Sequence, residues 1–428
     1  MESKRVWWAV LLVLWLAISG STQIFQDPYL EPEQSRLLGG LGMTWIDDQP
    51  YTTFTLAPDF AFGKFGFGLY FQLLFDNQNG FQLRKDEYKG GVGLLRAVRY
   101  VRYGHKYDPV YLRLGSIESY TMGSGFLMWN YNNASNYDKR KVGVVADLDF
   151  GKIGIESIYS SLANLEIVGG NFYLRPFRFM NPVPPLLGRF RVHATYLHDD
   201  RLLGGTLLDS TETLDVLGFG ADLQWLDLPF LKSAVYWDYG KIIHFGSGNA
   251  VGINAIFPDL IGVFGLGARF EKRYLGAQFI PSLFGPLYEL NRNLGVTAML
   301  QAQPKTEGYF GELSGHVIKR IRLIGSFQKL NGISHSGILH LEASAPRLVP
   351  RFELRAYYDK TNIETFKDAR TLDFNSVATV EVGYQLNRFL MLTTIYRWYW
   401  VEQTDASGLT VYKPVERIEP RISFHYAF

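Results

Sequence analysis

Residues 64–75 read KFGFGLYFQLLF, and their large apolar side chains recur at every second position. Odd positions from Phe65 to Phe75 are apolar, whereas the even positions include Lys64, Gly66 and Gln72. A period of two places these sets on opposite faces of a β-strand. The segment also has the length, about 9–11 residues, that a tilted strand needs to cross a bilayer.

The same alternation recurs along the chain. In 350–358, apolar residues alternate with Arg351, Glu353 and Arg355, so one face of the segment is charged. In 388–400, the tyrosines and tryptophans gather towards one end. Such clustering is typical of an aromatic girdle at the membrane surface.

Connections between these segments differ in length. The shorter ones are 62–64, 108–109, 150–152, 227–229, 258–259, 318–320, 346–350 and 387–388. The longer polar ones are 76–90, 119–140, 199–212, 240–248, 359–374 and 401–417. A soluble sandwich would also alternate, but short turns on one rim and long loops on the other indicate a transmembrane barrel.

We therefore predict an all-β fold, a closed transmembrane antiparallel β-barrel of 18 to 22 strands. With both chain ends at the short-turn rim, the segments number 22, and they include 274–283 and 294–303. The even number is the one expected of a single-chain bacterial barrel.

Three segments fit the pattern least well, namely 36–46, 91–104 and 274–283. In the second of them, Arg96, Arg99 and Arg102 cannot share a face unless the strand contains a β-bulge. Losing hairpins at these places would leave 20 or 18 strands.

The first 22 residues have the three parts of a secretory signal peptide: basic Lys4 and Arg5, an apolar stretch at 6–18, and small residues after it. We expect a signal peptide at 1–22, a short periplasmic segment at 23–35 and the barrel at 36–428. No separate plug domain is expected, because only 23–35 precedes the first strand.

Composition excludes several classes of protein. Lys and Arg number 43 against 41 Asp and Glu, so there is no excess positive charge for nucleic acid. No run of eighteen apolar residues occurs, which excludes a helical membrane protein. The absence of Cys excludes disulfides and thiolate nucleophiles.

The last segment alternates Ile422, Phe424, Tyr426 and Phe428 with polar residues, and Phe428 is the final residue. This ending resembles the C-terminal strand of bacterial outer-membrane β-barrels. The resemblance implies an outer-membrane location among lipids, insertion by the barrel-assembly machinery, and a porin-like architecture without a stated function. We therefore interpret Phe424, Tyr426 and Phe428 as an assembly signal.

Charged residues on the faces opposite the apolar ones are candidates for lining the lumen, since a lipid face would disfavour each midplane Arg by roughly 2–4 kcal/mol. The basic candidates are Arg113, Arg189, Arg191, Lys232, Arg269, Arg320, Arg322, Arg351, Arg355, Arg397 and Arg421. The acidic ones are Asp147, Asp149, Asp222, Asp238, Glu342, Glu353 and Glu381. They would form either a channel lining with mild anion preference or cross-strand ion pairs, such as Arg351 with Glu381, that fill the interior.

Loop 119–140 contains four consecutive apolar residues, Phe126, Leu127, Met128 and Trp129. Apolar residues in a loop that faces water favour burial. We expect them to fold into the lumen as a constriction, the alternatives being a cap on the mouth or a partner site. The segment 279–292 has the same property; we expect it at the opposite rim, and we expect it also to fold into the lumen.

Catalytic and metal sites have weak support. Neither Ser334-His335-Ser336 nor His198-Asp199-Asp200 has a spacing that brings a nucleophile, a base and an orienting group together. We expect no enzyme, no metal and no cofactor. The sequence favours an outer-membrane channel for small solutes; the alternative is a non-conducting scaffold that binds a periplasmic or surface protein.

Overall fold

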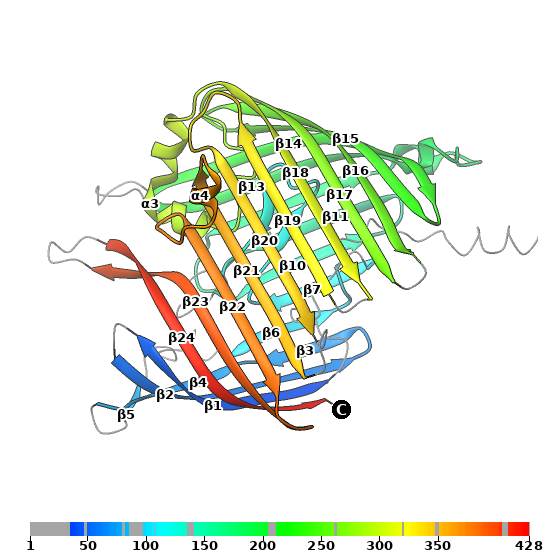
Figure 1. The fold of residues 1–428 in the computed structure, drawn as a ribbon. Helices are drawn as coiled ribbons and strands as arrows, with labels where there is room; N and C mark the ends of the chain where they lie inside the picture. Colours follow the sequence, from blue (N-terminus) through cyan, green and yellow to red (C-terminus); the bar gives the residue numbers. More distant parts are fainter. Residues whose placement is uncertain are drawn as a thin grey trace, which may run out of the picture.

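The computed structural model describes residues 35–46, 49–78, 82–84, 97–106, 108–134, 141–203, 211–260, 263–318, 321–346, 351–404 and 410–427. These residues form an antiparallel β-barrel with short helices at its rims (Figure 1). The expected signal peptide 1–22, all but the last residue of 23–35, and the candidates Arg96, Arg320 and Phe428 lie outside the described residues.

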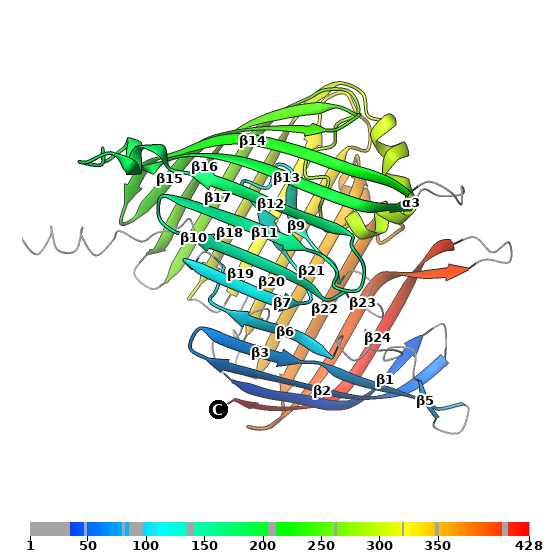
Figure 2. The same cartoon turned by 180° about the vertical axis from the view of Figure 1, so that it is seen from behind.

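The barrel wall is built from strands that follow one another around the ring (Figure 2). They are β1 (Arg36–Ile46), β2 (Gln49–Phe62), β3 (Phe65–Leu69), β4 (Phe71–Asp76), β5 (Gln82–Arg84), β6 (Val98–Tyr103), β7 (Val110–Gly115), β10 (Gly143–Asp149), β11 (Ile153–Tyr159), β12 (Ile167–Leu174), β13 (Phe190–Leu203), β14 (Thr211–Leu228), β15 (Leu231–Ile242), β16 (Ser247–Leu260), β17 (Phe264–Leu275), β18 (Thr306–Val317), β19 (Ile321–Leu330), β20 (Gly337–Pro346), β21 (Phe352–Ile363), β22 (Ser376–Gln385), β23 (Leu390–Thr404) and β24 (Thr410–Ala427).

The ring is closed by pairing of the first strand with the last, in which Arg36 is opposite Ala427 and Gly42 is opposite Arg421. β3 and β4 are two parts of one strand interrupted at Tyr70, and β5 and β6, which pair with β4 and β3, are likewise counted as one strand. Counted in this way, the described wall has 20 strands. The prediction of a closed antiparallel barrel of 18 to 22 strands is confirmed, with one hairpin fewer than the 22 segments counted in the sequence.

The hairpin that is absent from the wall is the one expected at 274–283 and 294–303. β17 pairs directly with β18, which leaves no place for two strands between them. Pro281 and Pro286 supply no backbone donor to a ladder. Residues after them form helix α3 (Tyr288–Gln301), which contains a kink at Gly295. These residues therefore lie at the same rim as loop 119–140, and the expectation of opposite rims was wrong.

The two faces of the wall follow the predicted alternation. Phe65 is 60% exposed on the outside, and Phe67, Leu69 and Phe71 share that face. Gly66, Gly68 and Gln72 are buried on the inside. The same holds around the ring, where the outward face carries exposed Phe, Leu, Ile, Val and Trp side chains.

The strand β6 in 91–104 contains a β-bulge, the condition under which the sequence allowed its arginines to share a face. The register between β3 and β6 shifts between Gly68 and Leu69. Arg102 is buried on the inner face, and Arg99 also reaches inward, where its Nη2 lies 2.7 Å from Asp59 Oδ1. The extra residue lets both arginines avoid the lipid-facing side.

Two connections fold into the barrel instead of standing above it. Residues 116–134, called the inserted loop below, contain a small separate hairpin, β8 (Tyr120–Met122) with β9 (Met128–Tyr131). The second, residues 276–303, includes α3 and is called the inserted helix segment. The remaining short helices, η2 (Pro176–Phe179), η3 (Leu187–Arg189) and α4 (Phe366–Ala369), lie in connections at the two rims. No helix in the described part of the chain is long and apolar enough to cross a membrane.

Candidate functional site

The inserted loop is held inside the barrel by hydrogen bonds to the wall. The Ile117 backbone N–H donates to Asn133 Oδ1 at 2.8 Å, and Asn133 Nδ2 donates to the Ser160 carbonyl at 2.7 Å. At its tip, the Gly123 N–H donates to Glu156 Oε2 at 2.7 Å. Gly123 has a φ of 59°, a left-handed conformation that suits a residue without Cβ.

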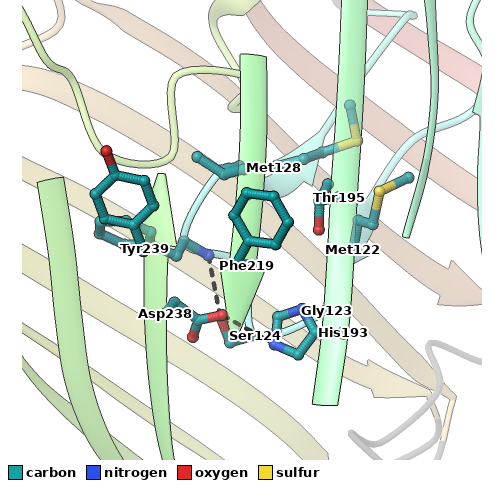
Figure 3. Close-up of a pocket in the computed structure, with 12 residues that line it drawn as sticks. Met122, Gly123, Ser124, Met128, His193, Thr195, Phe219, Asp238 and Tyr239 are labelled. Carbon is teal, nitrogen blue, oxygen red and sulfur yellow. Dashed lines mark hydrogen bonds and ion pairs between the residues drawn. The ribbon is translucent and has the colours of Figure 1, made fainter. Parts of the chain in front are cut away.

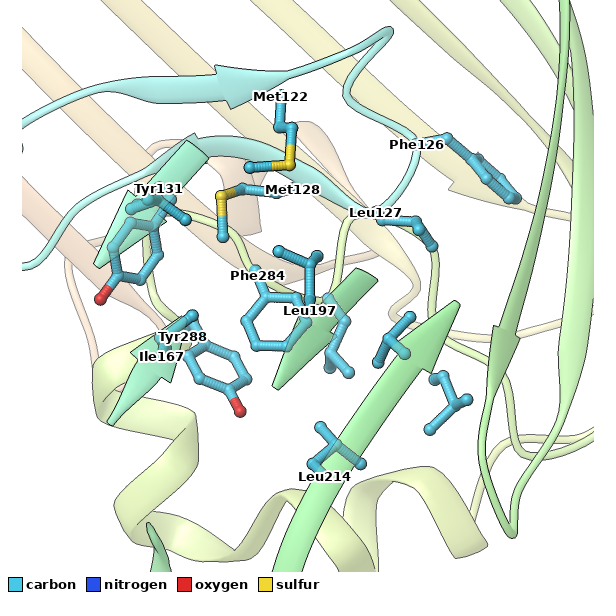
Figure 4. Packing of buried hydrophobic residues seen from close by; sticks show 14 of the residues in the cluster. Met122, Phe126, Leu127, Met128, Tyr131, Ile167, Leu197, Leu214, Phe284 and Tyr288 are labelled. Carbon is cyan, nitrogen blue, oxygen red and sulfur yellow. The ribbon is translucent and has the colours of Figure 1, made fainter. Parts of the chain in front are cut away.

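The four apolar residues of this loop are buried. Figure 4 shows three of them, Phe126, Leu127 and Met128, packed among residues of the wall and of the inserted helix segment. Phe126 stacks on Phe279 with ring centroids 5.6 Å apart. Leu127 fills the space above two wall glycines, since a Cβ on Gly218 or Gly240 would lie 2.6 Å from its methyl groups. This packing leaves Phe126–Trp129 inside the chain's own core, not on a surface open to a protein partner.

Met128 and Trp129 connect the two inserted segments to each other and to the wall. Met128 forms a β-bridge with Phe284, and the Trp129 N–H donates to the Phe284 carbonyl at 3.1 Å. The Trp129 indole donates to Glu312 Oε2 at 3.0 Å, and its ring lies edge-on to His340 at 5.4 Å. Trp129 therefore stands where the apolar packing ends and charged side chains of the wall begin.

A buried ionic cluster anchors the inserted helix segment. Arg292 of α3 donates to Glu166 Oε2 at 2.9 Å and to Asp199 Oδ1 at 2.7 Å. The Tyr288 hydroxyl donates to Asp199 Oδ2 at 2.7 Å, and Lys141 pairs with Glu166 and Glu289. Burial, and then the negative charge of Asp199, raise the pKa of Tyr288 well above its ordinary value. The hydroxyl therefore stays a proton donor to this carboxylate.

The apolar part of the interior lies on one side of the barrel. Its buried cluster includes residues from β7, β10–β17 and β19 together with both inserted segments. The inner faces of β19–β24 instead carry a set of ionised side chains, called the charged wall: Arg322, Glu342, Glu353, Arg355, Glu381, Arg397, Arg417, Glu419 and Arg421.

Water reaches part of the charged wall from inside the barrel. The side chains of Arg355 and Glu381 are 29% and 28% exposed, whereas Met128 in the apolar cluster is fully buried. Other members are more enclosed; Arg417 is buried and bonds Thr44 Oγ1 at 2.9 Å and Glu419. The wetter stretch around Arg355 is thus distinct from the packed half.

Most of the lumen candidates taken from the sequence lie on the inner face. They are Arg113, Asp147, Asp149, Arg191, Asp222, Asp238, Arg269, Arg322, Glu342, Glu353, Arg355, Glu381, Arg397 and Arg421. Lys232 and Arg189 lie close to the short-turn rim, where both approach Asp227, at 3.9 and 3.5 Å.

Contrary to the expectation from the sequence, Arg351 does not line the lumen opposite Glu381. It lies in the turn before β21, is exposed, and has a φ of 73°, so it does not oppose Glu381. The cross-strand neighbour of Glu381 on β21 is Arg355, and the guanidinium that bonds its carboxylate is Arg421, at 3.3 Å. A left-handed turn residue interrupts the alternation on which the expectation rested.

Ion pairs link many of these candidates. Arg191 bonds Asp222 at 2.6 Å, Lys106 bonds Asp147 at 2.6 Å, Arg175 bonds Asp149 at 2.8 Å and Arg397 bonds Glu419 at 2.9 Å. Arg417, Glu419 and the Arg273–Glu271 pair were missed in the sequence, although their alternation could have revealed them. Arg292 had no such signal, because it belongs to a helix.

A small cavity lies between the inserted loop and β13–β15 (Figure 3). His193 Nε2 lies 3.1 Å from Asp238 Oδ1 at its edge. The cavity measures about 10 Å³, room for a single water molecule and not for a solute.

The residues weighed for catalysis or metal binding are separated. His198 faces outward and its Nδ1 lies 2.8 Å from Asp215 Oδ1, whereas Asp199 faces inward to Arg292. His335 lies in an exposed turn and donates its backbone N–H to Glu364. In the described part of the chain, no group of three or more His, Asp or Glu side chains is arranged to hold a metal ion.

No protein-family model matches this chain, and no curated protein does. Among solved structures, the chain is similar to OccK2 (OpdF) of Pseudomonas aeruginosa, with 11% identity, a TM-score of 0.37, and coverage of 92% of this chain and 97% of that one. A structure of the same protein in complex with glucuronate has a TM-score of 0.36, also at 11% identity and the same coverage. OccD3 (OpdP) of P. aeruginosa has 10% identity, a TM-score of 0.32, and coverage of 96% and 94%. Similarity this low carries no argument about the substrate or function of this chain.

Proposed function

We propose that this chain is a channel of the bacterial outer membrane through which small solutes pass. The first support is the outer face of the barrel. Exposed large apolar residues surround it, among them Leu313 at 62%, Leu41 at 61% and Val251 at 51%. Water-exposed surfaces rarely carry such a continuous apolar band, whereas the lipid-facing band of a membrane barrel does.

The observation that carries the proposal is the water-accessible charge inside the closed ring. Arg355 and Glu381 face the interior, and more than a quarter of each side chain is exposed to solvent. A hydrated, charged inner surface surrounded by an apolar outer one suits passage of polar solutes across a membrane.

The proposed path follows the charged wall, past the edge of the inserted loop. Glu118, near the start of that loop, comes within 3.9 Å of Arg355 on β21. The apolar cluster occupies the other side, so Phe126, Leu127, Met128 and Trp129 restrict the path by filling space beside it. Arginines outnumber glutamates on the charged wall, which favours a mild preference for anions.

The remaining sequence-based expectations belong to the same proposal. The segment 1–22 acts as a cleaved signal peptide, and the barrel-assembly machinery recognises the C-terminal strand through Phe424, Tyr426 and Phe428. Phe424 is 40% exposed on the outer face of β24, which suits a contact made before or during insertion.

The alternative, a non-conducting scaffold, is supported by the ion pairs and by the packed half of the interior. Single-channel recording of the purified, folded protein in a planar bilayer distinguishes the two. Stepwise current in the folded sample, absent from a heat-unfolded sample in the same detergent, supports the channel. A folded, inserted barrel that carries no current contradicts the channel and supports the scaffold.

A further inference from the structure

One connection on the short-turn rim differs from all the others described there. Residues 175–189, between β12 and β13, are the longest of these connections and contain both η2 and η3. Five large apolar side chains of this turn are 43–58% exposed: Phe179, Met180, Val183, Leu186 and Leu187. Contiguous exposed apolar side chains on an ordered segment mark an interaction surface.

The turn is held in shape by its own hydrogen bonds, so the exposure belongs to a fixed structure. Arg178 Nε donates to the Gly188 carbonyl at 2.9 Å, and its Nη1 donates to the Gly151 carbonyl in the neighbouring turn at 2.9 Å. The Met180 N–H donates to the Phe177 carbonyl at 3.3 Å. These bonds tie the two ends of the turn to each other and to the neighbouring turn at Gly151.

The turn lies against the outside of the barrel. Phe177 packs edge-on to Phe190 with centroids 5.9 Å apart, and Phe190 faces outward because the next residue, Arg191, points inward to Asp222. In Figure 2 the turn projects beyond the strand ends at the left of the view. Its apolar patch is thus next to the lipid-facing side and not over the lumen.

The patch is bordered by positive charge. Lys152 Nζ lies 4.9 Å from the centre of the Phe179 ring, and the Arg178 guanidinium donates to two carbonyl oxygens. In the described part of the chain, neither cation has a carboxylate within ion-pair distance. Apolar residues with lysine and arginine at their edge are typical of segments that lie in the interface of an anionic membrane.

We propose that residues 175–189 form an anchor that rests in the headgroup region of the periplasmic leaflet, with Lys152 and Arg178 against lipid phosphates. The proposal rests on the membrane location given under the proposed function. Lipid is favoured over a periplasmic protein because the patch adjoins Phe150 and Phe230, which are 66% and 53% exposed at the same rim. The apolar surface of the turn is therefore continuous with the band that faces lipid.

The absence of Cys from the chain permits a direct test. A nitroxide on Val183→Cys is compared, in liposomes that contain phosphatidylglycerol, with one on Leu313→Cys at the outer face and one on Ser334→Cys in an exposed turn of the opposite rim. We expect the Val183→Cys label to collide more often with oxygen than with a water-soluble nickel chelate, as the Leu313→Cys label does. The Ser334→Cys label should show the reverse.

The controls separate the two proposals. If the Val183→Cys label behaves like the Ser334→Cys label while Leu313→Cys is in lipid, the anchor is refuted and a protein-binding turn is favoured. If Leu313→Cys is also in water, the membrane location itself fails. Adding Lys152→Gln should move the Val183→Cys label towards water in anionic liposomes; an unchanged label position would contradict the phosphate contact.

Discussion

Glu118 of the inserted loop and Arg355 of β21 approach within 3.9 Å inside the barrel, although β7, from which the loop begins, shares no backbone pairing with β21. The loop thus reaches across the interior to the charged wall. More than a quarter of each side chain is exposed to solvent. Any solute that follows the wetter side of the barrel passes this pair, which makes it the natural place to test the path.

Arg355 and Arg421 should set the charge preference of the path. Changing both to Gln removes two positive charges next to Glu381 and is expected to lower the anion-to-cation permeability ratio without unfolding the barrel, because interior substitutions tune selectivity. The reversal potential across a salt gradient measures this ratio. The effect should shrink at high salt, since the screening length falls from about 10 Å at 0.1 M to about 3 Å at 1 M.

Arg351→Gln is the control for position, because it makes the same kind of substitution, with the loss of one positive charge, in an exposed turn. Its reversal potential should equal that of the wild type. A double variant at Arg355 and Arg421 that also keeps the wild-type value would mean that selectivity is set elsewhere.

Trp129 should limit the width of the path, since it stands between the apolar cluster and His340. Trp129→Ala is expected to raise the single-channel conductance and to lower the free energy of unfolding by about 3–5 kcal/mol, the usual effect of such a truncation in a core. Trp225→Ala, on the lipid-facing side, is the control and should leave the conductance unchanged. Equal conductance in both variants would exclude Trp129 from the constriction.

Alternation along the sequence predicted the faces of the wall because a strand has a strict period of two, as 64–75 shows. It overcounted at 274–303, where proline and left-handed residues redirect the chain into the interior. It also placed Arg351 on the inner face of the barrel, because this turn residue continues the alternation of the strand β21 that follows it. Both errors arise where the backbone leaves the strand conformation while the residue types still alternate.

Arg292 should hold the inserted helix segment in place. Arg292→Met leaves Glu166 and Asp199 without that cation in a buried site, which typically costs about 3–5 kcal/mol. We expect faster proteolysis within 276–303. Lys329→Met removes an exposed partner of Glu364, a solvent-screened pair, and should leave the stability and the cleavage pattern nearly unchanged. Equal cleavage in the two variants would contradict an anchoring role.

The contacts of Arg292 show what a sequence pattern leaves undetermined. Its partners Glu166 and Asp199 lie 126 and 93 residues away along the chain, beside neighbouring wall strands that α3 reaches only because its segment folds inward. Alternation specifies which face a strand residue occupies. It carries no information about which side chain of an inserted segment reaches that face.

The end of β24 should act in assembly. Phe428→Ser, or deletion of 424–428, is expected to lower the amount of heat-modifiable, protease-resistant barrel in the membrane, because it removes the terminal aromatic pattern. Phe366→Ser changes an 80% exposed phenylalanine in the α4 connection and should leave that amount unchanged. A normal yield of folded Phe428→Ser protein would count against the assembly signal.

The most direct test of the proposed path is chemical modification of single cysteines during single-channel recording, in a chain that has none of its own. Arg355→Cys lies on the water-accessible part of the charged wall, and Met128→Cys lies in the packed half. We predict that a negatively charged, water-soluble thiosulfonate reduces the current through Arg355→Cys and leaves Met128→Cys and the wild type unchanged. Current through Arg355→Cys that persists after its complete modification would contradict a path along the charged wall.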